Sequence, residues 1–233
     1  MLARPPDEKS AAEYEGVALM IVIVDYRAGN LTSVKKALDE VGADSLITAD
    51  PEIVSRAEKI VLPGVGHFSA TSHLTDSGLR DAIVNSIQRG VPFLGICVGL
   101  QWLLESSEEA PEVPGLGIWR GECLRFPASV KSPHVGWNQL ELRDKPSRLL
   151  HGIPSGSYVY FTHSYRVPLL VNTVAECEYG GRFSAVVEQD HLFGVQFHPE
   201  KSGAVGLKLL ETFCSLEAPK GCDRVTLAEQ NAD

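Results

Sequence analysis

The chain has 233 residues, of which 44% are hydrophobic and 22% are charged. This is the composition of an ordinary globular protein; it excludes a disordered or fibrous chain, and the length suits one large domain. The formal net charge of −9 at pH 7 would repel a phosphate backbone, which argues against a nucleic-acid binder.

The five cysteines are odd in number and form no CxxC pair. We therefore predict neither a disulfide framework nor a zinc site. Free thiols fit a reducing compartment, so we expect a cytoplasmic protein. No apolar run reaches the roughly 18–20 residues that a membrane helix needs.

Both ends of the chain lack the periodic apolar face of a folded segment. Residues 1–19 contain neither the apolar stretch of a signal peptide nor the acid-poor composition of a transit peptide, so we predict a flexible extension. Met20 begins the first apolar run, and an over-called start codon is an alternative origin of the residues before it. Residues 217–233 are polar and predict a loose tail. One domain remains, at residues 20–216.

Strand-like and helix-like patterns alternate in the first half of this domain. Short apolar runs predict strands, and apolar residues at three- to four-residue intervals predict helices, the first of them capped by Asn30. The predicted strands are Met20–Asp25, Lys59–Leu62 and Pro92–Ile96, and the predicted helices carry Leu31, Val34, Leu38 and Val41, then Leu79, Ile83 and Ile87, then Val98–Leu104. Such alternation predicts an α/β fold with a mixed, mostly parallel sheet flanked by helices on both faces.

The pattern changes between Gly121 and Phe197 to short strands separated by glycine and proline turns. An antiparallel or mixed addition to the sheet is predicted here. The predicted strands are Tyr158–Thr162, Phe183–Glu188 and Leu192–Phe197. A last helix, with Val205, Leu209, Leu210, Phe213 and Leu216 on one face, is predicted to close the domain.

The segment around Cys97 has the spacing of a nucleophile elbow. Gly95 and Gly99 lie two residues before and after Cys97, where a buried strand runs into a helix. Glycines leave room for neighbouring backbone in so sharp a turn, and the helix N–H groups would favour the thiolate form of Cys97. A small cysteine that only packs in the core is the alternative. The spacing favours a nucleophile, with the N–H of Val98 as an oxyanion donor.

A thiol nucleophile needs a base, and the base needs a partner that orients it. In the segment Phe197-His198-Pro199-Glu200, the proline favours extended backbone before it. Residues two apart in extended chain point the same way, so the Glu200 carboxylate can reach the His198 ring. Taken alone, this could equally be a histidine at a strand end beside a solvated acid. Together with the elbow it predicts a Cys97-His198-Glu200 triad.

A second glycine-rich loop, Leu62-Pro63-Gly64-Val65-Gly66, ends another predicted parallel strand. Loops at the carboxyl ends of parallel strands gather around one site, and glycines expose backbone amides to a ligand. The N–H of Val65 is therefore a candidate second oxyanion donor. The loop matches neither a P-loop nor a dinucleotide-binding pattern, and alone it would more often be a turn than a site.

These segments resemble class I glutamine amidotransferases, and most closely the glutaminase subunits of imidazole glycerol phosphate synthase. The elbow and the His-Pro-Glu segment are shared by the wider class, whereas segments 25–34 and 133–138 are typical of the histidine-pathway members. The matching segments are 25–34, 62–68, 94–101, 105–109, 133–138 (Pro-His-Val-Gly-Trp-Asn), 160–165 and 196–202. One departure is Arg27, where the family usually has glycine.

The resemblance implies a flavodoxin-like fold and hydrolysis of glutamine to glutamate and ammonia through a thioester on Cys97, without a metal or organic cofactor. It implies an oxyanion hole formed by the amides of Val65 and Val98. It implies substrate binding by Gly64, Gly66, Gln101, Glu109, Ser164 and Tyr165. It also implies a heterodimer with a (β/α)8-barrel cyclase subunit, which receives the ammonia.

Tyr160 and Lys201 are expected near the mouth of the site, where the resemblance places the cyclase. A solvated lysine with no role is the alternative for Lys201. Two other readings of the whole chain remain at this stage. One is another enzyme, either a different amidotransferase subunit, such as that of pyridoxal phosphate synthase, or a cysteine peptidase. The other is a non-catalytic regulatory module of the same fold.

Overall fold

The computed structural model describes residues 21–217. The predicted extension, Met20 and the predicted tail beyond residue 217 lie outside the described residues. Within them, the central sheet has eight strands in the order β2-β1-β3-β4-β13-β12-β11-β8. These strands are β1 Ile21–Val24, β2 Ser45–Thr48, β3 Lys59–Gly64, β4 Phe93–Cys97, β8 Glu141–Leu142, β11 Thr173–Glu178, β12 Arg182–Gln189 and β13 Leu192–Val195.

The first five strands in this spatial order are parallel, and the remaining three are antiparallel. Parallel pairing joins β2 to β1, β1 to β3, β3 to β4 and β4 to β13, whereas β12, β11 and β8 continue the sheet antiparallel. The order 2-1-3-4, followed by a fifth parallel strand, is that of flavodoxin-like sheets. The predicted α/β fold with a mixed, mostly parallel sheet is confirmed.

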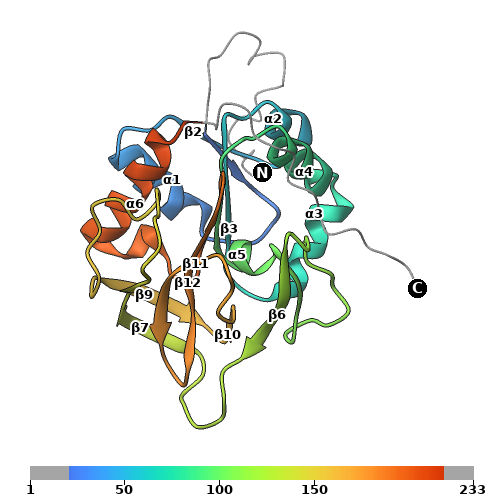
Figure 1. Cartoon of the computed structure of the whole chain (residues 1–233). Helices are drawn as coiled ribbons and strands as arrows, with labels where there is room; N and C mark the ends of the chain where they lie inside the picture. Colours follow the sequence, from blue (N-terminus) through green and yellow to red (C-terminus); the bar gives the residue numbers. More distant parts are fainter. Residues whose placement is uncertain (1–20, 218–233) are drawn as a thin grey trace, which may run out of the picture.

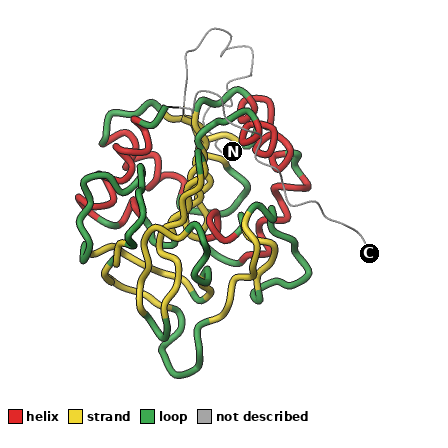
Figure 2. The backbone as a smooth tube through the Cα atoms, viewed as in Figure 1, coloured by secondary structure: helices red, strands yellow, loops and turns green. Residues whose placement is uncertain are grey.

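Helices cover both faces of this sheet, as Figures 1 and 2 show. The helices α1 (Leu31–Glu40) and α6 (Gly203–Ser215) lie on one side, and α2 (Pro51–Ser55), α3 (Ser72–Asp76) and α4 (Leu79–Gln88) lie on the other. Asn30 caps α1 as predicted, because its side chain accepts a hydrogen bond from the Ser33 N–H. No helix among residues 21–217 is long and apolar enough to cross a membrane.

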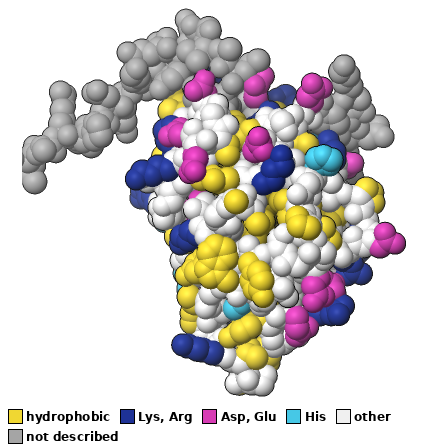
Figure 3. Space-filling model, turned by 90° about the vertical axis from the view of Figure 1, so that its left-hand side faces the viewer, with side chains coloured by type: hydrophobic (Ala, Val, Ile, Leu, Met, Phe, Trp, Pro, Cys, Tyr) yellow, Lys and Arg dark blue, Asp and Glu magenta, His cyan; other side chains and the backbone are white. Residues whose placement is uncertain are grey.

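A separate two-stranded sheet lies beside the central one. It pairs β7 (His134–Gln139) with β9 (Tyr158–His163) in antiparallel register. Its outer face carries exposed apolar side chains, with Val135, Trp137 and Tyr158 each more than half exposed. Figure 3 views the molecule from the side on which β7 and β9 lie in Figure 1 and shows apolar side chains grouped on this face.

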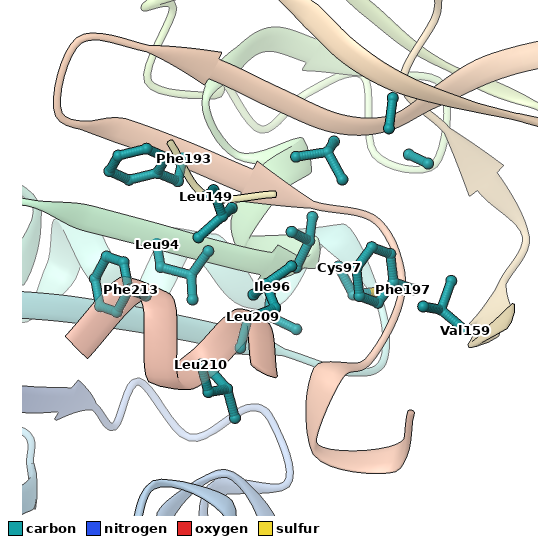
Figure 4. Packing of buried hydrophobic residues seen from close by; sticks show 14 of the residues in the cluster. Leu94, Ile96, Cys97, Leu149, Val159, Phe193, Phe197, Leu209, Leu210 and Phe213 are labelled. Carbon is teal, nitrogen blue, oxygen red and sulfur yellow. The ribbon is translucent and has the colours of Figure 1, made fainter. Parts of the chain in front are cut away.

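The core consists of two clusters, one on each face of the central sheet, because successive strand residues point to opposite faces. Leu94 and Ile96 of β4 belong to the cluster on the α6 side, and Phe93 belongs to the other. Figure 4 shows Leu209 and Phe213 of α6 packed against this part of the sheet. Cys97 lies at the end of the same strand and belongs to the same cluster, so core packing fixes the position of the elbow.

Several predicted boundaries were wrong, among them the end of β13 at Val195 instead of Phe197, and two of them bear on the site. The helix predicted over Val98–Leu104 is the short α5 (Val98–Gln101), and Leu104 begins β5 (Leu104–Ser107), which pairs with β6 (Trp119–Arg125); β10 (Tyr165–Arg166) pairs with the other edge of β6. The reason is tertiary: the carbonyls of Trp102, Leu103 and Leu104 accept hydrogen bonds from Leu116, Trp119 and Gly117, not from a continued helix.

The second difference is that β3 continues through Pro63 and Gly64 instead of ending at Leu62. Pairing with β1 stops at Val61, so beyond it β3 is paired only with β4. A proline is tolerated where one edge of a strand is unpaired, because its missing N–H then removes no ladder hydrogen bond.

Candidate active site

Cys97 lies at a strained turn between β4 and α5. Its φ of 55° is in the left-handed region, which is costly for a residue with a side chain. A Cβ on Gly95 would lie 2.5 Å from the Gly99 carbonyl oxygen, and a Cβ on Gly99 would lie 1.9 Å from the Leu62 carbonyl oxygen. Neither glycine can therefore carry a side chain, which is the steric reason that the sequence pattern predicted.

The glycine-rich loop that follows β3 lies beside the elbow. In the parallel pairing of β3 with β4, Gly64 is opposite Cys97, and Val65 follows at the strand end. A Cβ on Gly64 would lie 2.5 Å from the Tyr26 hydroxyl and 2.6 Å from the Val98 Cβ. Gly64 therefore makes room for close packing under the elbow. Because α5 is so short, the elbow offers its own first backbone amides but not the dipole of a long helix.

His198 and Glu200 form a buried pair. The His198 Nδ1 lies 2.8 Å from Glu200 Oε1, and both side chains are 1% exposed. Burial alone would lower the pKa of His198, but its interactions with Cys97 and with the Glu200 carboxylate raise it to about 9. The ring therefore carries a proton readily, as an acid that protonates a leaving nitrogen needs. His198 and Glu200 are in contact as their spacing predicted, but the backbone at Glu200 is not extended, because Pro199–Lys201 forms the short 3₁₀ helix η3.

The segment that carries His198 is tied to β9 by the backbone. The His198 N–H donates to the Tyr160 carbonyl at 2.9 Å. The Ser202 hydroxyl donates to the His198 carbonyl at 2.6 Å and accepts from the Tyr160 N–H at 3.0 Å. Sequence reasoning gave Ser202 no role, because one of its two partners, Tyr160, lies on another strand.

A cavity of about 200 Å³ opens beside the Cys97 sulfur. The predicted residues Gly66, Gln101, Glu109, Ser164 and Tyr165 line it together with Cys97 and Val98. Gly64 and Val65 are outside this lining, and Pro133, Thr162 and His163 belong to it without having been predicted.

Two of the cavity residues are held by backbone groups. The Glu109 carboxylate accepts a hydrogen bond from the Phe68 N–H at 2.8 Å, and the Gln101 amide donates to the Tyr165 carbonyl at 2.8 Å. A carboxylate, amides and backbone carbonyls suit the ammonium and carboxylate of an amino acid. Among residues 21–217, no cluster of three His, Cys, Asp or Glu side chains is arranged to hold a metal.

Gln196 is a residue that the sequence reasoning missed. Its side chain is fully buried, and its amide nitrogen lies 3.7 Å from the Cys97 sulfur. The sequence offered one signal, because Gln196 lies in segment 196–202, which matches the family and also holds His198 and Glu200.

Tyr160 and Lys201 meet at the rim of the site. The Lys201 Nζ lies 5.9 Å from the centroid of the Tyr160 ring, within the range of a cation–π contact. Trp137 packs against the same ring, with ring centroids 6.0 Å apart. The three side chains therefore join the outer face of β7 and β9 to the segment that carries His198 and Glu200.

Comparison with known proteins agrees with this geometry. The family model for class-I glutamine amidotransferases matches residues 22–215. Imidazole glycerol phosphate synthase subunit HisH 1 of Methanococcus maripaludis is 44% identical over 204 residues, which cover 84% of this chain and all of the relative. Subunit HisH of the same synthase from Thermococcus kodakarensis is 48% identical over 200 residues, which cover 83% and 98%.

Solved structures agree at the level of the fold. A crystal structure of a glutamine amidotransferase has a TM-score of 0.66 at 21% identity and covers 82% of this chain and 98% of that one. PurLQS from Thermotoga maritima has the same TM-score and identity, with 84% and 97% covered. With the buried His198–Glu200 pair, the family match and relatives that align over nearly their whole length, the chain belongs to the class-I glutamine amidotransferase family and, within it, to the imidazole glycerol phosphate synthase HisH subunits.

Proposed function

We propose that residues 20–216 form one glutaminase domain, which hydrolyses glutamine to glutamate and ammonia with Cys97, His198 and Glu200. The observation that carries this proposal is the strained Cys97 beside a cavity, with a buried His198–Glu200 pair at 2.8 Å next to it. The thiolate attacks the side-chain amide carbon, and the carbon–nitrogen bond breaks as His198 protonates the departing nitrogen. Water deprotonated by His198 then cleaves the thioester, which releases glutamate and the thiolate, while Glu200 keeps the ring oriented.

The negative oxygen of each tetrahedral intermediate needs donors in place before the reaction. We assign this role to the amides of Val98, on the elbow, and Val65, on the neighbouring strand end. Gly66, Gln101, Glu109 and the backbone at Ser164 and Tyr165 would hold the amino-acid end of glutamine, since they line the cavity. Gly64 would serve the same site indirectly, by allowing Tyr26 and Val98 to pack against the loop.

The partner of this domain is proposed to be the (β/α)8-barrel cyclase subunit, in a cytoplasmic heterodimer that makes imidazole glycerol phosphate and an aminoimidazole carboxamide ribotide. Ammonia is mostly protonated in neutral water and is then no nucleophile, so it has to reach its acceptor without entering bulk solvent. The exposed apolar face of β7 and β9 borders the cavity through Thr162 and suits such a partner. Tyr160 and Lys201 would lie within that interface.

The test is Cys97→Ala in the complex with the cyclase. Glutamine-driven product formation should be abolished, because the thioester cannot form. Synthesis from added ammonium should continue, because the cyclase does not need the thiol. Glutamate release and product formation are measured for both nitrogen sources. Substantial glutamate release by Cys97→Ala would contradict the assignment.

A further inference from the structure

Two buried amide side chains connect the nucleophile to the far wall of the cavity. Gln196 is completely buried and Gln101 is 2% exposed. The Gln101 nitrogen lies 2.8 Å from the Tyr165 carbonyl oxygen and 3.4 Å from the Gln196 side-chain oxygen. The Gln196 nitrogen then lies 3.7 Å from the Cys97 sulfur.

The orientation of the two side-chain amides follows from the group at the Tyr165 end of this series of hydrogen bonds. A backbone carbonyl only accepts hydrogen bonds, so Gln101 turns its NH₂ group toward Tyr165. The same NH₂ group has a second hydrogen, which requires an acceptor, and the Gln196 oxygen supplies it. Gln196 is thereby oriented with its own NH₂ toward Cys97, and a flipped amide would set two donors against each other.

A donor aimed at the sulfur acts on the reacting atom. A hydrogen bond to a charged group is stronger than one between neutral groups, so the Gln196 N–H stabilises a thiolate more than a thiol. It also holds the sulfur in one position in a turn where the backbone of Cys97 is strained. His198 is the proton-transfer partner of the thiol, whereas the Gln196 amide does not exchange a proton with it and only donates a hydrogen bond.

We propose that Gln196 is a further catalytic residue, which donates a hydrogen bond to the Cys97 sulfur and keeps the thiolate ready for attack. The proposal rests on the glutaminase function described above. The competing interpretation is that Gln196 is buried only to satisfy Gln101, in which case the sulfur would not respond to its loss.

The test replaces the donor at constant volume with Gln196→Met, and Gln88→Met, at an exposed position of α4, is the matched control. The rate of alkylation of Cys97 by iodoacetamide at neutral pH is followed by mass spectrometry of its peptide, which separates it from the other thiols. We expect alkylation about 10-fold slower in Gln196→Met and unchanged in Gln88→Met. In the complex with the cyclase, kcat for glutaminase should fall roughly 10- to 100-fold, with KM within about threefold.

A folded Gln196→Met variant that is alkylated at the wild-type rate would overturn the proposal. If that variant does not fold, Gln196→Asn, which keeps an amide but withdraws it by one methylene, should show slower alkylation. Failure of both variants to fold would show that Gln196 is a structural residue and would equally overturn it. The alkylation assay needs neither glutamine nor the cyclase. Lack of glutaminase activity in the wild-type complex would therefore count against the proposed function and be distinguishable from failure of this inference.

Discussion

At the scale of single residues, the loop after β1 keeps a conformation that suits glycine better than the residue present. Arg27 has a φ of 66°, in the left-handed region. Its N–H donates to the Asp25 carboxylate at 2.8 Å, which helps to hold the turn. Arg27 therefore occupies left-handed backbone that a glycine would adopt without steric strain, at a cost in stability.

We expect Arg27→Gly to be more stable than Arg27→Ala by about 1 kcal/mol, because alanine keeps the steric strain of the left-handed backbone and glycine removes it. Both substitutions remove the charge, so their difference isolates the backbone term. Urea unfolding of the two variants at neutral pH measures it. An alanine variant as stable as the glycine variant would show that the turn is not strained.

Glu200→Gln should slow glutaminase turnover less than His198→Ala does. The amide oxygen can still accept from the ring, so orientation is partly kept, whereas the imidazolium loses its carboxylate partner. Loss of the general acid and base in His198→Ala should cost at least about 100-fold in kcat. Since the Glu200 carboxylate helps to raise the pKa of His198 to about 9, Glu200→Gln should also shift the alkaline limb of the pH–rate profile downward. Wild-type rates in Glu200→Gln would remove Glu200 from the triad.

At the scale of elements, the sheet of β7 and β9 buries a cluster of aromatic rings that includes two histidines. His134 and His163 are directly opposite each other in the pairing of these strands. His134 stacks on Tyr179 with ring centroids 3.9 Å apart, and the His163 Nδ1–H donates a hydrogen bond to the Tyr165 carbonyl at 2.9 Å. Burial lowers the pKa of His134 to about 4 and that of His163 to about 3, so both rings are neutral in the folded protein at neutral pH.

The cluster should make the fold sensitive to acid. Above pH 6.5 both rings are neutral whether folded or unfolded; below it the unfolded chain binds protons that the folded chain does not, so stability falls as pH falls toward 4. We expect a loss on the order of 5 kcal/mol between pH 6.5 and 4, roughly half of it from each ring. His134→Phe should reduce this loss, because phenylalanine preserves the stacking and cannot be protonated. Urea unfolding across this pH range tests it, and an unchanged pH dependence would exclude His134 as a source.

At the scale of the whole molecule, segments far apart in the chain converge at the carboxyl edge of the parallel strands. The elbow ends β4, the glycine-rich loop follows β3, and His198 follows β13, which pairs with β4. Lys201, Tyr160 and Trp137 then connect this edge to the exposed face of β7 and β9. A partner docked on that face would lie directly beside the segment that carries His198 and Glu200.

Lys201→Ala should weaken the complex with the cyclase or its ammonia transfer, and leave the triad able to react. A cation at the rim can pair with an acid across the interface, where desolvation makes the pair stronger than on a free surface. Lys208→Ala, on the exposed side of α6, is the matched control. Glutamate formed per imidazole glycerol phosphate made is measured with partner affinity. Wild-type values for both would mean that Lys201 is only solvated.

Features of this protein that depend on local sterics could be predicted from the sequence. The sharp turn at Cys97 excludes side chains at Gly95 and Gly99. The pairing of His198 with Glu200 also followed from their close spacing, although Pro199–Lys201 is a short 3₁₀ helix and not the extended backbone that was predicted. The alternation of strands and helices likewise follows from short-range periodicity, so the parallel sheet was predicted correctly.

Features that depend on partners distant in the chain were decided only by the tertiary structure. The helix after Cys97 ends early because the N–H groups of residues 116, 117 and 119 donate hydrogen bonds to the carbonyls of residues 102–104. Gln196 reaches the Cys97 sulfur from 99 positions away, and Ser202 bridges to Tyr160 over 42. Gly64 belongs to a recognisable glycine-rich loop, yet the reason that a side chain cannot be placed there is Tyr26, which follows another strand and packs against it. Local patterns specify conformation over a few residues, whereas such contacts exist only once the sheet has assembled, and no short-range pattern in the sequence encodes them.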